Sequence, residues 1–118
     1  MPRKMSFAMT TQQVREGTKD VTRRLGWWNL KPGEIVDACV KCMGLKKGEK
    51  VEILRQIRIV SIRSEHLNEI TKAEIIREGF PDMSREEFIT FFMKGHKCFH
   101  GVLTTVNRIE FEYVKDPQ

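Results

Sequence analysis

The chain has 118 residues, a length that suits one domain over residues 1–118. Of these residues, 40% are hydrophobic and 31% are charged, a composition that excludes a disordered chain. No apolar run is long enough to cross a bilayer and no apolar core follows the basic start, so we expect a cytoplasmic protein without a membrane partner. The net charge of +5 is compatible with an RNA, DNA or nucleotide partner.

Strand patterns occur early in the chain and again at its end. The β-branched content and alternation predict strands at residues 5–9, 35–40, 51–54 and 56–63 and, last, where Ile109, Phe111 and Tyr113 alternate with Arg108, Glu110 and Glu112. Tight turns are predicted at residues 31–34, which read Lys-Pro-Gly-Glu, and at residues 45–48.

Three helices are predicted by a hydroxyl N-cap followed three residues later by Glu or Gln. The cap pairs are Thr10 with Gln13, Thr71 with Glu74, and Ser84 with Glu87. The glycines expected to close these helices in the left-handed conformation are Gly17, Gly79 and Gly95. In the last helix, Phe88, Phe91, Phe92 and Met93 are expected to form a core face.

Strands, then a helical pair, then a closing strand predict an α+β fold. Five or six mainly antiparallel strands of this length suit a small β-barrel with flanking helices.

The segment from Gly17 to Trp28 concentrates residue types that suit an anionic or flat ligand. Glycine leaves room against the backbone, Lys and Arg supply cations, and threonine supplies a hydroxyl. We therefore expect a basic cleft lined by Gly17, Lys19, Thr22, Arg23, Arg24, Trp27 and Trp28. The alternative is that Lys19 and Arg24 only form surface ion pairs with Glu110 or Glu112.

The two tryptophans are adjacent, so on a strand they point to opposite sides. One is expected in the core, and the other faces solvent or stacks on a ligand. The sequence leaves open which of the two is outside.

The spacing of Gly17, Lys19, Thr22 and Arg24 gives the pattern G-x-K-x-x-T-x-R, which resembles the signature of the ASCH family. The order of the later features is also similar: the turn at residues 31–34, barrel strands, a helical insert and a final strand. The resemblance covers most of the chain and implies a PUA-like barrel. It also implies binding of RNA, a nucleotide or a nucleoside in the basic cleft.

One group of ASCH-like proteins consists of amidohydrolases that remove the acyl group of N4-acetylcytidine with a Lys, a Thr and a Glu. The resemblance assigns these roles to Lys19, Thr22 and, in the expected helical insert, Glu78. In this alternative, Thr22 is the nucleophile and Lys19 accepts its proton, because burial and the neighbouring Arg23 and Arg24 lower the pKa of the amine. Glu78 orients Lys19 or acts on the leaving group.

The thiol and imidazole groups cluster at Cys39-Val40-Lys41-Cys42 and at His96-Lys97-Cys98-Phe99-His100. A structural zinc requires four ligands, but the second cluster lacks the usual spacing, so we expect no metal and no cofactor. A disulfide is disfavoured in a reducing cytosol, so free thiols are expected. The second alternative function, a ribonuclease, needs an acid and a base, and His96 with His100 is the histidine pair in question.

Overall fold

A five-stranded curled sheet organises the protein; the structure, a computed structural model, describes residues 2–42 and 45–115. The strands are β1 (Arg3–Ser6), β2 (Val21–Arg24), β3 (Ile35–Cys39), β4 (Ile53–His66) and β5 (Thr105–Tyr113). Their order across the sheet is β1-β3-β4-β5-β2, with β1 and β3 parallel and the other neighbours antiparallel. The predicted α+β class with a mainly antiparallel, barrel-like sheet is confirmed.

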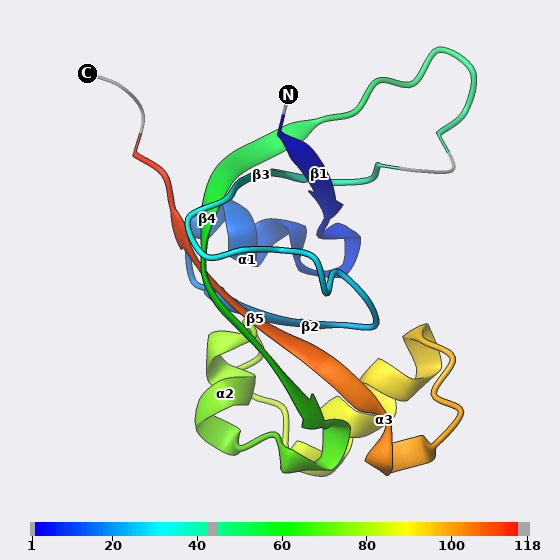
Figure 1. The fold of residues 1–118 in the computed structure, drawn as a ribbon. Coiled ribbons are helices and arrows are strands. Elements are labelled where there is room, and N and C mark those ends of the chain that lie inside the picture. Colours follow the sequence, from blue (N-terminus) through cyan, green and yellow to red (C-terminus); the bar gives the residue numbers. More distant parts are fainter. Residues whose placement is uncertain (1, 43–44, 116–118) are drawn as a thin grey trace.

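The helices of the described part of the chain pack at two levels of this sheet (Figure 1). They are the 3-10 turns η1 (Ala8–Thr10), η2 (Leu67–Glu69) and η3 (Gly101–Leu103) and the α-helices α1 (Thr11–Glu16), α2 (Lys72–Arg77) and α3 (Arg85–Gly95). In Figure 1, α1 lies beside β1 and β3 in the upper half, whereas α2 and α3 lie in the lower half, beneath β2 and along β5. None of these helices is long and apolar enough to span a membrane.

The longest strand, β4, replaces the two strands predicted at residues 51–54 and 56–63. Its first half pairs with β3 and its second half with β5, so the ladder continues where the sequence suggests a break. The register shifts between Ile59 and Ser61, a bulge that helps the sheet to curl. The first strand also ends earlier than predicted, because residues 8–10 form η1.

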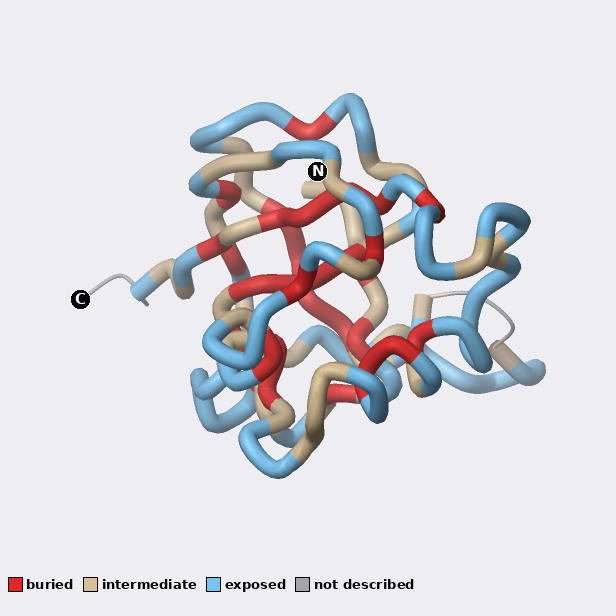
Figure 2. Tube along the Cα trace, turned by 90° about the horizontal axis from the view of Figure 1, so that it is seen from below, coloured by how far each residue is buried: buried red, intermediate tan, exposed pale blue. Residues whose placement is uncertain are grey.

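Two clusters of buried side chains fill the interior, and Figure 2 shows the buried residues along the central elements with exposed loops around them. The cluster that we call the sheet core consists of Met5, Phe7, Val14, Leu30, Val36, Ala38, Ile57, Ile59, Ile109 and Phe111. The cluster that we call the helical core consists of Leu67, Ile70, Ile75, Phe88, Ile89, Phe92 and Val106. The predicted core face of α3 is therefore confirmed for Phe88 and Phe92, whereas Phe91 is half-buried outside the cluster and the prediction is wrong for Met93, which is exposed.

The three predicted helix N-caps make different hydrogen bonds in the structure. Ser84 and Glu87 form the complete capping box at the start of α3. Thr71 accepts the amide of Glu74, but the carboxylate of Glu74 bonds to arginines instead of the cap. Thr10 makes no side-chain cap bond, so that predicted cap is wrong and α1 is held by its surroundings.

The turn predictions largely hold. Gly17, Gly33 and Gly79 have positive φ values of 75°, 91° and 102°, as the predicted helix ends and turn require. In the turn at residues 31–34, the Glu34 amide donates to the Lys31 carbonyl at 3.1 Å. Gly95 is an exception: it is the last residue of α3 and does not have a positive φ.

Candidate ligand-binding site

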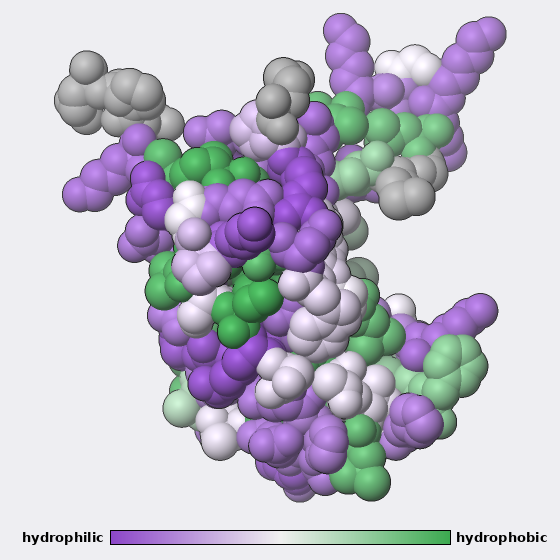
Figure 3. Space-filling view, in the orientation of Figure 1, coloured by the Kyte–Doolittle hydropathy of each residue, from purple (hydrophilic) through white to green (hydrophobic). Residues whose placement is uncertain are grey.

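A cavity of about 570 Å³ lies where β2, the end of β1 with η1, and α3 meet. Its size is within the range of pockets for small organic ligands. Its polar lining includes Lys19, Thr22, Arg23, Arg24 and Glu78. Its aromatic lining consists of Phe7, Phe80, Phe88, Phe91, Phe92 and His96. Figure 3 shows the molecular surface hollowed on the right-hand side, above the lobe that contains α3.

The cavity exists because the curled sheet does not close at β1 and β2. These strands are the two ends of the strand order and share no ladder among the described residues. Arg24 bridges them: its Nη2 donates to the Ser6 carbonyl at 2.5 Å and its Nε to Thr22 Oγ1 at 3.3 Å. The same guanidinium lies 4.8 Å from the centre of the Phe7 ring. One side chain thus replaces a row of backbone hydrogen bonds and leaves space beside it.

The polar end of the cavity is built on a buried ion pair between Lys19 and Glu78. Lys19 Nζ donates to Glu78 Oε1 at 2.8 Å and to the Glu78 carbonyl, also at 2.8 Å. The two residues are only 2% and 3% exposed. The Lys19 carbonyl also accepts the hydroxyl of Tyr113, so the residue is held at its backbone and its amine. The alternative in which Lys19 only pairs with Glu110 or Glu112 at the surface therefore does not hold, because its partner is the buried Glu78.

Glu78 reaches this position because α2 ends there. It is the C-cap of α2, and Gly79 follows it with a positive φ. A Cβ on Gly79 would lie 2.7 Å from Cγ of Gln13, whose amide donates to the Gly79 carbonyl at 3.2 Å. Asp20 bonds to Arg77 through backbone and side chain, which fixes α2 beside the Lys19 segment. Contacts far apart in sequence thus hold Glu78 in place.

The charge of Arg23 is paired with three carboxylates and is not left free in the cavity. Its guanidinium contacts Glu65 at 2.6 Å, Glu74 at 2.8 Å and Glu78 at 3.0 Å. Arg108 pairs with the same Glu74 at 2.7 Å. This network joins β2, β4, β5 and α2, so Arg23 contributes structure as well as part of the cavity wall.

The burial of these ions changes their pKa values. Burial lowers the pKa of Lys19, although Glu78 opposes the shift, so the neutral amine is more accessible than in an ordinary lysine. Burial also lowers the pKa of Arg24 to about 10. Hydrogen bonds from Arg108, and then from Arg23, lower the pKa of Glu74 to about 2. The cavity therefore combines a buried lysine whose pKa is lowered with arginines that are held in fixed positions.

Three residues of the predicted cleft do not line the cavity. Gly17 is exposed at the end of α1, where a Cβ would lie 3.1 Å from Arg55. Trp27 and Trp28 lie in a turn rather than on a strand, held by Asn107, whose amide donates to the Gly26 and Trp27 carbonyls at 3.1 Å. Trp27 packs against the sheet core, whereas Trp28 is 48% exposed. The tryptophan on the outside is thus Trp28.

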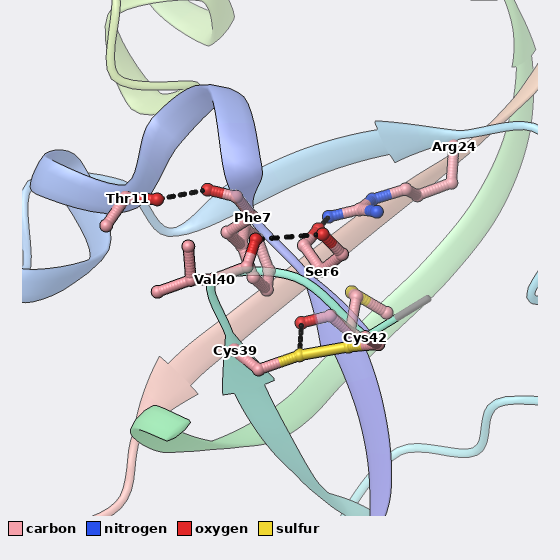
Figure 4. The surroundings of a disulfide bond; sticks show 8 residues. Ser6, Phe7, Thr11, Arg24, Cys39, Val40 and Cys42 are labelled. Atoms are coloured by element: carbon pink, nitrogen blue, oxygen red, sulfur yellow. Dashed lines mark hydrogen bonds between the residues drawn. A yellow bond between two sulfur atoms is a disulfide. The ribbon is translucent and has the colours of Figure 1, made fainter. Parts of the chain in front are cut away.

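The expectation of free thiols is wrong for Cys39 and Cys42, which form a disulfide. Bends at Val40 and Cys42 after β3 bring their Cα atoms to 6.6 Å, within the range that a disulfide spans. Figure 4 shows this bond behind the end of β1, where Ser6 Oγ donates to the Val40 carbonyl. The third cysteine, Cys98, packs against the helical core. Across residues 2–42 and 45–115, no three His, Cys, Asp or Glu side chains lie together as metal ligands do.

The two histidines of the ribonuclease alternative have different surroundings. His96 lines the cavity, and its ring stacks on Phe92 at a centroid distance of 4.1 Å. His100 is exposed, precedes η3 and does not line the cavity.

Sequence reasoning missed the aromatic wall as part of the site. Phe80, Phe88, Phe91 and Phe92 form a cluster of rings whose centroids lie 5.2–6.4 Å from their neighbours. Phe88 and Phe92 are buried, whereas Phe80 and Phe91 are half-buried beside the cavity. Three phenylalanines within five residues were a visible signal, but their spacing fits a core face equally well.

No protein-family model matches this chain, and no curated protein matches it. Solved structures do match its fold. The hypothetical protein PH0355 is 21% identical, with a TM-score of 0.68 over 97% of this chain and 100% of that one. Protein EF3133 from Enterococcus faecalis V583, of the DUF984 family, is 17% identical, with a TM-score of 0.67 over 97% and 80%. The ASCH domain from Lactobacillus crispatus JV V101 is 14% identical, with a TM-score of 0.63 over 94% and 78%.

The chain therefore has the small, barrel-like α+β fold of an ASCH domain.

Proposed function

We propose that the cavity binds a nucleoside or nucleotide, either free or as part of an RNA chain. The observation that carries the proposal is the meeting of an aromatic wall with a buried polar cluster in one cavity of about 570 Å³. A base has a flat apolar face and a polar edge, so it matches both surfaces at once. The phenylalanines of α3 contact the face, and Lys19, Thr22 and Glu78 bond to the edge.

The paired state of the cations favours recognition of the base over attraction of a bare phosphate. Lys19 and Arg23 already contact carboxylates within 3.0 Å, so little of their charge is free for a second anion. Arg24 is the cation of the cavity whose hydrogen-bond acceptors are a carbonyl and a hydroxyl. It is therefore the residue that we assign to a phosphate or to an acceptor atom of the ligand.

Calorimetric titration of the protein with the four common ribonucleosides and their 5′-monophosphates tests this proposal. We expect at least one of them to bind, and Thr22→Val to weaken that binding by about tenfold, because it removes a hydroxyl and keeps the shape. Thr105→Val is the matched control, since Thr105 is exposed on β5 outside the cavity. Absence of binding by all eight ligands contradicts the proposal.

We also propose hydrolysis of an N-acylated nucleoside such as N4-acetylcytidine as a second candidate function. The favouring observation is that Lys19, Thr22 and Glu78 line one cavity and that burial lowers the pKa of Lys19. In this scheme, Thr22 Oγ attacks the amide carbon and its proton passes to the neutral Lys19 amine. Lys19 then returns the proton to the leaving nitrogen, and water releases the acyl group from Thr22. Glu78 holds the Lys19 amine in position at 2.8 Å.

Chromatography of N4-acetylcytidine incubated with the protein tests the second candidate. We expect conversion to cytidine by the parent chain and by Thr105→Val, and none by Thr22→Val or Lys19→Met. Binding of the nucleoside without conversion eliminates hydrolysis and leaves the binding function intact.

A further inference from the structure

The segment after α3, residues 96–104, presents an aromatic side chain to solvent; we call it the rim loop. Phe99 in this loop is 88% exposed. The loop is nevertheless held on both sides of Phe99. Cys98 packs against the helical core, the Gly101 amide donates to the Cys98 carbonyl at 3.1 Å, and the Thr104 hydroxyl donates to the Gly101 carbonyl at 2.7 Å. Because the backbone on both sides of Phe99 is held, stacking of its ring on a ligand orders the ring alone and not the loop, which lowers the entropic cost.

The charges within the rim loop and on the end of α3 are of one sign, and Glu69 of η2, which contacts η3, is the acidic neighbour on the other side of the loop. No Asp or Glu occurs in the sequence between Glu87 and Glu110, whereas Lys94 and Lys97 are both present and exposed. Figure 3 shows hydrophilic and hydrophobic side chains side by side over this lobe, at the lower right. Exposed aromatic rings interleaved with cations are the combination that binds single-stranded nucleic acid, because the rings stack on bases and the cations contact phosphates.

The rim loop is continuous with the cavity. Lys94 and His96 line the cavity, and His96 stacks on Phe92, which belongs to the aromatic wall. Phe99 follows His96 by three residues, a reach of at most about 10 Å along the backbone. A nucleotide in the cavity therefore has its chain neighbour within reach of Phe99.

We infer that the rim loop binds the adjoining nucleotide of a single-stranded nucleic acid whose first base occupies the cavity. Phe99 stacks on the adjoining base, and Lys94 and Lys97 contact the phosphates that join the two. This inference rests on the proposed binding of a nucleoside in the cavity. It makes the physiological ligand a strand rather than a free nucleoside.

Fluorescence anisotropy with labelled octaribonucleotides of uridine, cytidine and adenosine, competed by the corresponding 5′-monophosphates, tests the inference. We expect one octamer to bind at least tenfold more tightly than its monophosphate. Phe99→Ala should weaken octamer binding by about tenfold and leave monophosphate binding unchanged. Phe99→Tyr retains the ring and should retain the affinity, whereas Phe99→Leu should behave as Phe99→Ala does. Lys97→Gln should lower the slope of log affinity against log salt by about 0.7, the value of one phosphate contact on a single strand.

Several outcomes overturn the inference while leaving the proposed function in place. They are equal affinities for octamer and monophosphate, or an octamer affinity that Phe99→Ala does not change. If neither probe binds, the proposed function fails as well. Sedimentation that shows self-association lost in Phe99→Ala would assign the loop to a second copy of the chain. Binding to phosphatidylserine vesicles that is lost in Phe99→Ala would assign it to a lipid surface.

Discussion

The sheet core and the helical core differ in what lies against them. In the sheet core, Phe111 and Ile109 lie among other buried apolar side chains on a curled sheet. The helical core borders the ion network of Lys19, Arg23 and Glu78, and its Phe88 and Phe92 line the cavity, to which the sheet core contributes Phe7. A cavity with both an apolar and a polar wall thus forms where an apolar cluster meets buried charge. The four predictions below test this difference between the two regions.

The largest expected effect is in the sheet core. Phe111→Ala should lower the free energy of unfolding by about 3–5 kcal/mol, because a fully packed ring leaves a void that the strands cannot fill. Urea denaturation followed by circular dichroism measures it. Phe99→Ala, a change of the same size at an exposed ring, should alter stability by no more than about 0.5 kcal/mol. Equal losses in both variants would contradict the division into packed and exposed aromatics.

The ion network gives the next effect. Lys19→Met should cost about 3 kcal/mol, because Glu78 then keeps its buried charge with Arg23 as its remaining partner. Adding Glu78→Gln should recover part of this loss, since the uncompensated charge is removed. A double-mutant cycle by urea denaturation measures the coupling. Strictly additive losses would show that the 2.8 Å contact carries no coupling energy.

The junction that positions Glu78 gives a smaller effect. Gly79→Ala should cost about 1–3 kcal/mol, because φ is +102° and the new Cβ meets Gln13 at 2.7 Å. Gly95→Ala is the matched control, since Gly95 is helical and has open space around it. It should stabilise the protein by about 0.5 kcal/mol. Thermal unfolding distinguishes the two, and a stabilising Gly79→Ala would refute the strained junction.

The smallest effect concerns pH. The pKa of Glu74 is about 2 in the folded protein against an ordinary 4.5, so its contribution to stability is complete above pH 4.5 and is lost as the pH falls toward 2. We expect this loss to be no more than about 2 kcal/mol, because part of the group is screened by solvent. Urea denaturation between pH 2.5 and 6 should show a flatter profile for Glu74→Gln than for the parent. Glu86→Gln, at an exposed carboxylate of α3, should reproduce the parent profile.

Most of the sheet could be predicted from the sequence because its signal is local, but β2 (Val21–Arg24) was not predicted, since its four residues include three polar ones and show no apolar alternation. Ile109 and Phe111 alternate with polar residues along β5, and the capping box of Ser84 starts α3 where expected. The exposure of Met93 and the missing cap bond of Thr10 could not be predicted, because both depend on how each helix packs against the rest of the protein. No local sequence pattern encodes that packing.

The candidate site could be predicted only in part, because some of its residues are close together in the sequence and others are brought together by the fold. Lys19 and Thr22 are near each other in sequence, but Glu78 lies 59 positions from Lys19, and it was assigned by family resemblance alone. The α2 helix brings it to the cavity through contacts with Asp20 and Gln13 that no spacing rule contains. Trp27 packs on the sheet core and Trp28 is exposed, as the expectation of one inside and one outside requires, but neither lines the cavity, because both lie in a turn away from it.

The bridge made by Arg24 has a consequence for how the molecule opens. Within the described chain, β1 and β2 each have a neighbouring strand on one side alone, and a single guanidinium links their ends. Opening this junction breaks fewer hydrogen bonds than separating β4 from β5. Deuterium from solvent should therefore reach the amides of β1 and β2 well before those of the central strands. The ends of β1 and β2, which line the cavity, are then also the part of the sheet that opens at the lowest free-energy cost. A ligand can therefore enter between them without unfolding of either core.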